Sequence, residues 1–343
     1  MSRERIPPSI DLHEDVSTYF LTHGGGEPLG DFNKDLPGRD ADIPKYQRGN
    51  VRIVFAAIFP GIESFDPGTS RVLEEAYGKW LPATRYRVPQ ALFWEHISIY
   101  YKLSEAYGVR IIESFNDVEE CLRGQVLCFI IHLEGAEAID DPYDLVILKK
   151  IGLRSLGLTW NYMNKYGTGC LAKKDLGLTS DGEELIRLAN KLGVIIDLAH
   201  ASKRTTLEAI EISKKPVIIS HANARRLVDK PRNIDDEVLE ALHRNRGVVG
   251  ISAIGSLVST KPRSSIDDLV QHFVYIYERF GSDILAIGTD FLGLLGLPAP
   301  EGFESIDKLP ALYEKLREKG FSDRDIERIA YKNALRVIES NLR

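Results

Sequence analysis

Hydrophobic residues in this chain are grouped in short continuous runs that show little alternation with polar residues. The runs are rich in Ile, Val, Leu and Phe, and longer stretches separate them. A continuous apolar run is typical of a strand in a parallel sheet that helices cover on both faces. The pattern predicts eight strands, at residues 10–15, 51–58, 126–134, 153–160, 193–200, 216–221, 247–254 and 284–290.

The stretches between the predicted strands carry helix start and stop signals. In residues 180–193, Ser180 is a candidate N-cap and Gly193 a candidate C-terminal stop. Residues 235–247 likewise begin with a candidate N-cap and end with a glycine. Both stretches are therefore predicted to be helices.

Strands that alternate with helices predict a (β/α)8 TIM barrel, a fold of the α/β class. A doubly wound open sheet shares the alternation, but it would not gather residues of its first and last strands into one site. We expect a single domain over residues 1–343. Residues 61–107 are predicted to form a helical insertion after the second strand, which would supply a helix beside the barrel and part of the rim of the site.

Side chains of the metal-binding type stand at the carboxyl ends of five predicted strands. In a parallel barrel these ends meet on one face, and active sites lie on that face. Residues two apart in an extended strand point to the same side, so the first strand can offer a histidine and an aspartate to one ion. Convergent imidazoles and carboxylates predict a metal-dependent hydrolase. The candidate residues are His13, Asp15, Glu134, His200, His221 and Asp290.

Each candidate has a chemical role and a plainer structural alternative. Glu134 could bridge two cations with its two carboxylate oxygens, or pair with an arginine such as Arg154. His200 and His221 offer neutral imidazole nitrogens, which suit zinc, although a lone histidine in such a strand is more often a hydrogen-bonded core residue. Asp290 could pass a proton to the leaving amine, or cap a helix.

The composition narrows the range of partners. Lys and Arg total 44 against 50 Asp and Glu, a net charge of −6, and no dense basic tract occurs, so neither nucleic acid nor an anionic membrane is expected as a partner. A small-molecule substrate is expected instead. The amino-terminal sequence has no apolar stretch of the signal type, and no run of about 18 apolar residues follows, so we expect a cytoplasmic protein.

The chain has three cysteines, Cys121, Cys128 and Cys170. An odd number without metal-type spacing argues against a disulfide framework. We expect all three to be small core residues or unreactive thiols.

Taken in order, these segments resemble the zinc dipeptidases typified by renal, or membrane, dipeptidase, within the amidohydrolase-like barrels. The resemblance runs nearly end to end, and among the segments that carry it are DLHED, HLEGAEAI, GVIIDLAHAS, PVIISHANARRLVDKPRNIDDE and GTDF. It implies two divalent metal ions, with zinc expected. It is also compatible with a homodimer.

The same resemblance implies a role for each site residue. His13 and Asp15 would bind one metal ion, Glu134 would bridge both ions, and His200 and His221 would bind the second ion. Asp290 matches the acid/base aspartate of the family, and Arg232 matches the arginine that binds the terminal carboxylate of the substrate, a task suited to its bidentate fork.

Two departures from the family affect the expected substrate. Animal members have a histidine where this chain has Trp160, followed by Asn161, and both residues are expected to contact substrate. Trp160 can donate one N–H and offer an aromatic wall, but it cannot shuttle a proton. His132 could replace the missing histidine, although a deeper role in orientation or packing fits its position better. The second departure is Leu292, where the family has another aspartate.

The expected activity is hydrolysis of dipeptides by a water molecule held between two divalent metal ions, with Asp290 relaying a proton. No covalent intermediate is needed, and the chain has no GxSxG motif. A related amidohydrolase activity on N-acyl or D-amino acid amides is the first alternative. The second alternative is a non-catalytic, metal-containing binding barrel.

Overall fold

The computed structural model of the protein describes residues 6–23, 31–60, 89–294 and 296–343. The strands in these residues form one sheet in which every pairing is parallel. They are β1 (Ser9–Glu14), β2 (Val51–Ile58), β3 (Arg110–Ile111), β4 (Cys128–Leu133), β5 (Leu153–Gly157), β6 (Ile195–Asp197), β7 (Ile218–Ile219), β8 (Val248–Ile251) and β9 (Leu285–Ile287).

The sheet closes on itself because β2 pairs with both β1 and β4, and β9 pairs with β1. Eight strands make the ring, each within or overlapping one predicted run, so the predicted (β/α)8 barrel is confirmed. The sequence pattern does not predict β3, which pairs with the first two residues of β4. With two residues, one of them the exposed Arg110, this strand has no apolar run that could reveal it.

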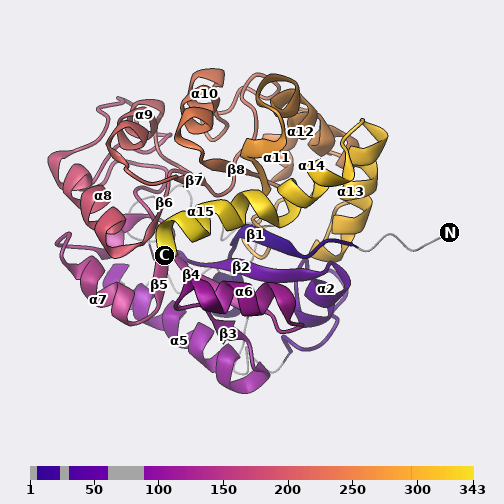
Figure 1. The fold of residues 1–343 in the computed structure, drawn as a ribbon, viewed down its shortest axis with the longest axis horizontal. Helices are drawn as coiled ribbons and strands as arrows, with labels where there is room; N and C mark the ends of the chain where they lie inside the picture. Colours follow the sequence, from indigo (N-terminus) through magenta and orange to yellow (C-terminus); the bar gives the residue numbers. More distant parts are fainter. Residues whose placement is uncertain (1–5, 24–30, 61–88, 295) are drawn as a thin grey trace.

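Helices surround the barrel (Figure 1). The α-helices are α1 (Val16–His23), α2 (Ile43–Arg48), α5 (Pro89–Tyr107), α6 (Phe115–Arg123), α7 (Asp144–Lys150), α8 (Ser180–Leu192), α9 (Lys203–Ile212), α10 (Asp236–Asn245), α11 (Gly255–Val258), α12 (Ile266–Phe280), α13 (Leu309–Glu318), α14 (Asp323–Glu327) and α15 (Asn333–Leu342). Short helices of other types are η1 (Ala136–Ala138), η2 (Ser282–Ile284), η3 (Ile306–Lys308) and the π-helix η4 (Arg328–Lys332).

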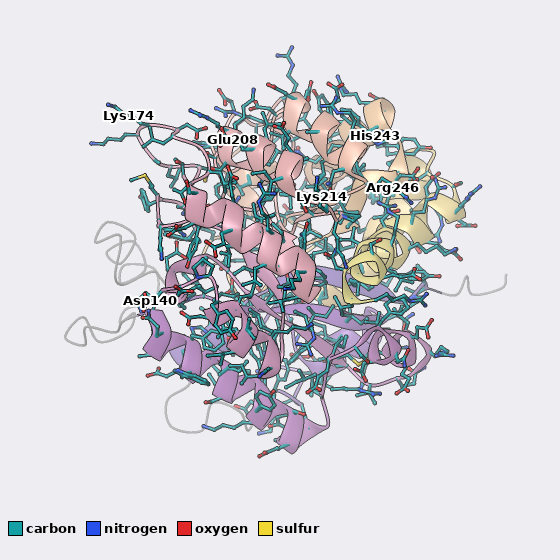
Figure 2. All side chains as sticks on the ribbon, turned by 60° about the vertical axis from the view of Figure 1, so that its left-hand side comes forward. Asp140, Lys174, Glu208, Lys214, His243 and Arg246 are labelled. Atoms are coloured by element: carbon teal, nitrogen blue, oxygen red, sulfur yellow. A yellow bond between two sulfur atoms is a disulfide. The ribbon has the colours of Figure 1, made fainter. Side chains whose placement is uncertain are left out.

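The outer faces of these helices are polar. Figure 2 shows Glu208 of α9 and His243 of α10 among the side chains that cover the outer surface, together with Lys214, which follows α9. Among the described residues, no helix combines the length and the apolar character that crossing a bilayer requires.

Both helices that the start and stop signals predict are present, with small shifts of their capping residues. α8 is capped by Thr179, whose side chain accepts a hydrogen bond from the backbone of Gly182, and it ends at Gly193 with a left-handed φ of 72°. α10 ends at Arg246, which adopts φ 62°. The predicted stops are therefore correct to within one residue.

The helical part of the predicted insertion is confirmed by α5, which buries Leu92, Phe93 and Tyr100. Residues 61–88, the other part of the predicted insertion, lie outside the described residues. The prediction that this stretch contributes to the rim of the site stays a prediction.

The barrel interior is apolar toward the ends at which the strands begin. Leu12, Phe55 and Ile130 from three strands share one buried cluster with side chains of α15 and α6. α15 lies across this end (Figure 1). Its Asn341 donates a hydrogen bond to the backbone carbonyl of Pro216, the residue that shortly precedes β7. The opposite end, where the strands stop, is left for polar side chains.

The expectation that all three cysteines are free is wrong for two of them. Cys121 of α6 and Cys128 of β4 form a disulfide, with their Cα atoms 6.2 Å apart. Gly124 ends α6 and lets the chain return directly into β4, which brings the two residues together. An odd count argues against a framework of disulfides, but it does not exclude one local pair. Cys170 is a free thiol, as expected.

Candidate active site

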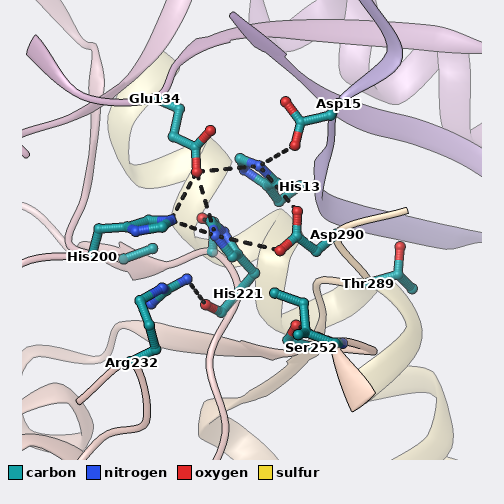
Figure 3. A network of polar contacts seen from close by, with 12 residues as sticks. His13, Asp15, Glu134, His200, His221, Arg232, Ser252, Thr289 and Asp290 are labelled. Atoms are coloured by element: carbon teal, nitrogen blue, oxygen red, sulfur yellow. Dashed lines mark hydrogen bonds and ion pairs between the residues drawn. The ribbon is translucent and has the colours of Figure 1, made fainter. Parts of the chain in front are cut away.

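The first part of the site forms where β1 ends (Figure 3). His13 Nε2 lies 3.6 Å from Asp15 Oδ2 and 3.7 Å from Glu134 Oε1. It also lies 3.7 Å from Asp290 Oδ1. Glu14 faces away, as expected, and its Oε2 accepts a hydrogen bond from Tyr46. Residues from β1, from the end of β4 and from the segment after β9 are thus brought together.

The second part of the site is built by the segments after β6 and β7. His200 Nε2 lies 2.9 Å from Glu134 Oε1 and 3.0 Å from His221 Nε2. His221 Nε2 lies 3.5 Å from the same oxygen of Glu134 and 3.8 Å from Asp290 Oδ2. One carboxylate oxygen of Glu134 therefore stands among the imidazoles of both parts. All six residues predicted for the site converge.

The backbone is turned sharply at the site. His200 and Asp290 have left-handed φ angles of 65° and 66°, which are uncommon for residues other than glycine and often mark functional sites. The backbone of Asp290 is held by donating its N–H to the carbonyl of His13 at 3.0 Å. Gly293 leaves room for Asp15, because a Cβ atom there would lie 2.0 Å from Asp15 Oδ2. Small residues and left-handed turns therefore allow the charged side chains to approach one another.

The donor set fits divalent metal ions. Both ring nitrogens of His13 are buried without a hydrogen-bond partner among the described residues, and such an orphaned polar group requires an explanation. Ligand atoms lie within 4.8 Å of one another in two groups, His13 with Glu134 and His221, and His13 with Asp15 and Asp290. Imidazole nitrogens together with carboxylate oxygens are a set that zinc and similar ions accept.

Among the protein groups alone, the charges of the site are poorly balanced. Burial raises the pKa of Glu134 well above its usual value and that of Asp290 to about 8. Burial also lowers the pKa of His200 and His221 well below the usual range. Burial opposes protonation of His13 too, but the nearby carboxylates, led by Glu134, raise its pKa to about 10. A divalent cation among these groups would favour the ionised carboxylates and neutral imidazoles.

Outer contacts fix the orientation of several of these groups. His200 Nδ1 lies 2.7 Å from Asn161 Oδ1, and Thr18 donates to Asp15 Oδ1 at 3.0 Å. Arg232 donates from Nη2 to the backbone carbonyl of His221 at 3.2 Å. Sequence reasoning did not single out Thr18, and it did not foresee that Asn161 bonds to His200.

A cavity of about 200 Å³ opens onto the site. One side is charged and the other apolar, and aromatic rings form part of the apolar side. The ring centroids of Trp160 and Phe59 are 5.0 Å apart, and those of Trp160 and His200 are 5.7 Å apart. The lining residues are Asp15, Thr18, Phe59, Glu134, Trp160, Asn161, His200, Arg232, Ile254, Ser256, Leu257, Asp290 and Gly293.

The loop that carries Trp160 is held by a buried carboxylate that the sequence pattern does not reveal. Glu137 Oε1 accepts hydrogen bonds from the backbone N–H of Trp160 at 3.3 Å and from the side-chain amide of Asn164 at 3.0 Å. Gly135 is required beside it, because its φ is 86° and a Cβ atom there would lie 2.1 Å from Glu137 Oε2.

His132 lies one layer deeper in the barrel, as the orientation or packing interpretation expects. It is fully buried, with Nδ1 2.9 Å from Ser155 Oγ and Nε2 3.3 Å from Asp197 Oδ2. Its ring centroid is 5.4 Å from that of His13. This position favours support of the site over contact with substrate.

Arg154 and Leu292, which the sequence also singles out, both make hydrogen bonds that the sequence does not predict. Arg154, considered as an ion-pair partner of Glu134, donates instead to backbone carbonyls, including that of Glu113. Leu292 has φ 64°, and its N–H donates to Asp40 Oδ2 at 3.0 Å. The turn after Asp290 thus receives a carboxylate from a distant segment, although Leu292 itself has none.

Two more buried carboxylates close to the site, Asp11 of β1 and Asp197 of β6, were not expected from the sequence to take part in it. The signal that could have found them is a carboxylate within an apolar run, since such a group is costly to bury without partners.

Comparison with known families agrees with this geometry. The family model described as membrane dipeptidase, peptidase family M19, matches residues 4–342. This chain belongs to the membrane dipeptidase family. The resemblance expected from the sequence is therefore confirmed, and the chain is a metal-dependent hydrolase of the M19 type. A non-catalytic binding barrel is disfavoured by this membership.

Two dipeptidases and one solved metallopeptidase are among the proteins to which this chain is similar. Dipeptidase verJ of Clonostachys rogersoniana is 28% identical over 97% of this chain and 84% of its own length. Dipeptidase 3 of Mus musculus is 28% identical over 90% of this chain and 64% of its own length. Among solved structures, a metallopeptidase of Rhodobacter sphaeroides liganded with a phosphinate mimic of L-Ala-D-Ala shares the fold, with a TM-score of 0.85 and 24% identity over 98% of this chain and 100% of that chain.

Proposed function

We propose that this M19 family member is a binuclear metal dipeptidase that hydrolyses the peptide bond of dipeptides. The observation that carries the proposal is the position of Glu134. Its Oε1 lies 3.7 Å from Nε2 of His13 on one side and 2.9 Å from Nε2 of His200 on the other. A carboxylate between two groups of ligands is what a bridging role requires.

The two metal sites are assigned to residues that already converge. His13 and Asp15 would hold one ion, His200 and His221 would hold the second, and Glu134, which lies near both pairs, would contribute to both sites. Zinc is the expected metal, because it accepts both imidazole and carboxylate ligands. Ions bound by these residues would supply Lewis-acid chemistry, which activates water and polarises a scissile carbonyl.

The remaining residues of the cavity bind substrate and move a proton. Asp290 accepts a proton at its carboxylate from the attacking water and passes it to the leaving amine. Arg232 lines the cavity and binds the terminal carboxylate of the substrate with its guanidinium. Trp160 and Phe59 provide a wall for an apolar substrate side chain, and Asn161, whose Oδ1 contacts His200, faces substrate with its amide nitrogen.

The substrate assay separates the proposed activity from its alternative. The Rhodobacter sphaeroides structure holds a mimic of L-Ala-D-Ala, so the panel should include dipeptides with L- and D-residues at the carboxyl end, beside N-acyl amino acids and D-amino acid amides. We expect cleavage of free dipeptides of at least one configuration. Cleavage confined to N-acyl or amide substrates would contradict the dipeptidase assignment and favour a related amidohydrolase activity.

A cytoplasmic location and a homodimer are proposed from the sequence alone. The disulfide between Cys121 and Cys128 argues against a cytoplasmic location, because structural disulfides are rare in a reducing cytosol. Cell fractionation tests the location, and light scattering of the purified protein tests the dimer.

A further inference from the structure

The two carboxylates that lie beside the site, Asp11 and Asp197, make matching sets of backbone and hydroxyl hydrogen bonds, and Asp197 also lies 3.3 Å from Nε2 of His132. Their relative exposures are 0% and 1%, so each must have its hydrogen-bonding capacity met within the protein. Both accept a backbone N–H from the residue two positions further along the chain. Asp11 Oδ1 accepts from His13 at 3.1 Å, and Asp197 Oδ1 accepts from Ala199 at 3.0 Å.

Each carboxylate also binds one residue of the neighbouring strand segment through both its backbone and its hydroxyl. Asp11 accepts from the N–H of Thr289 at 3.0 Å and from its Oγ1 at 2.6 Å. Asp197 accepts from the N–H of Ser220 at 2.8 Å and from its Oγ at 2.5 Å. β1 adjoins β9 and β6 adjoins β7, so each carboxylate ties together two adjacent strand ends.

The hydroxyl residues stand directly before site residues. Thr289 precedes Asp290, and Ser220 precedes His221. The regular strands have already ended at these points, since β9 ends at Ile287. Backbone N–H groups beyond the strand ends no longer donate to a carbonyl of the neighbouring strand. The buried carboxylates accept these hydrogen bonds instead.

The second pair reaches a proposed ligand directly. Ser220 Oγ lies 2.8 Å from His221 Nδ1. Because the hydroxyl donates to Asp197, it accepts from His221 Nδ1–H, which leaves Nε2 unprotonated and facing Glu134. Such outer hydrogen bonds orient metal-binding histidines and strengthen them as ligands.

We propose that Asp11 with Thr289 and Asp197 with Ser220 are twin clamps, positioning residues that each set one part of the metal site. The Asp11 clamp sets His13 and Asp290, and the Asp197 clamp sets His221. The inference rests on the proposed function for the presence of two ions, but the hydrogen bonds themselves are independent of it.

Removal of each hydroxyl tests the clamps. Thr289→Val and Ser220→Ala should each weaken binding of one zinc ion about 10- to 100-fold while the other ion stays bound, measured by chelator competition with Zn²⁺ and by metal analysis. Thr289→Ser and Ser220→Thr keep the hydroxyls and should restore wild-type affinity. Ser9→Ala is a matched control, because it removes a buried hydroxyl bonded to Tyr313 at the other end of β1.

Hydrogen exchange separates failure of the clamps from failure of the proposed function. The amides of residues 199 and 220 should exchange at least 10-fold faster in Ser220→Ala, and those of residues 13 and 289 in Thr289→Val, with or without metal. Unchanged exchange and unchanged zinc affinity in both variants would overturn the clamps. Equal zinc loss in the Ser9→Ala control would also overturn them, since the effect would then be general destabilisation. A wild-type protein that binds no zinc would contradict the proposed function, and the exchange rates would still decide the clamps.

Discussion

Asp290 and Asp15 are both carboxylates of the site, but their surroundings suit different tasks. Burial raises the pKa of both groups, yet for Asp15 the charge of the nearby His13 and the hydrogen bond from Thr18 outweigh burial and lower the pKa. For Asp290, burial dominates and the pKa rises to about 8. Among the protein groups alone, Asp290 therefore binds a proton more readily than Asp15, a difference that suits Asp290 to acid/base work and Asp15 to metal binding.

Replacement of Asp290 by asparagine tests this division of roles. Asp290→Asn keeps the shape of the side chain but cannot accept and release a proton, so turnover should fall about 100- to 10,000-fold. Metal content should stay at the wild-type value, measured by elemental analysis of the same sample. Loss of a metal ion together with turnover would show that Asp290 serves as a ligand, and retained turnover would remove it from proton transfer.

Arg232 is the residue assigned to the terminal carboxylate of the substrate. Arg232→Lys keeps the charge but loses the bidentate fork, so KM for a dipeptide should rise about 10-fold or more with a smaller change in kcat. Arg225→Lys is a matched control, because this arginine lies in the same segment and pairs with Asp229 at the surface. If a dipeptide amide, which lacks the carboxylate, showed the same rise in KM, Arg232 would have another role.

Asp40 offers a test of pH dependence outside the metal site. Burial raises its pKa to about 6. A carboxyl group with a raised pKa holds its proton longer in the folded chain than in the unfolded chain. Its contribution to stability is therefore present below about pH 4 and is lost as the pH rises through about 6.

In Asp40→Asn this loss should disappear, so the variant should gain on the order of 2 kcal/mol in free energy of unfolding relative to wild type between pH 4.5 and 7.5. Urea unfolding at several pH values measures it, and the asparagine can still accept the N–H of Leu292. Parallel stability curves for the two proteins would contradict the raised pKa.

Among the elements, the sequence predicts the eight strands of the ring best, and it places the proposed ligands at the strand ends, where their side chains converge. A buried parallel strand must be apolar along its length, so the run that ends in His221 is visible without knowledge of its neighbours. β3, by contrast, cannot be predicted, because a strand of two residues leaves no hydrophobic pattern in the sequence.

Contacts that depend on where a loop returns could not be predicted. The bond between Asn161 and His200 joins residues 39 positions apart, and its partner is fixed only when the barrel has closed. The carboxylate of Asp40 meets Leu292 across a separation of 252 positions. Such pairs carry no local spacing that a single sequence could reveal.

The disulfide between α6 and β4 can be tested by its effect on stability. Its cysteines are 7 positions apart, so the cross-link restricts the unfolded chain, and Cys121→Ala should lower the free energy of unfolding by about 2 kcal/mol. Denaturant unfolding of the variant and of Cys170→Ala, a matched control, measures the effect. Reductant should destabilise the wild type and leave Cys121→Ala unchanged. Equal stability of wild type and Cys121→Ala would show that the cross-link contributes nothing.

In the barrel as a whole, the apolar cluster that stabilises the fold and the polar residues of the site lie at opposite ends. One end is closed by α15 and filled with apolar side chains such as Leu12 and Phe55. The other end collects histidines and carboxylates from β1, β4 and the segments after β6, β7 and β9. Closure of the ring is what makes this possible, because it places the first strand beside the last.

The metal content of the purified protein, measured together with dipeptide hydrolysis before and after chelation, decides whether this chain is a binuclear metal dipeptidase. We expect two zinc-class ions per chain, loss of hydrolysis when a chelator removes them, and recovery when zinc is restored. Dipeptide hydrolysis that continues in the metal-free protein, or a chain that binds no metal after reconstitution, would contradict this assignment.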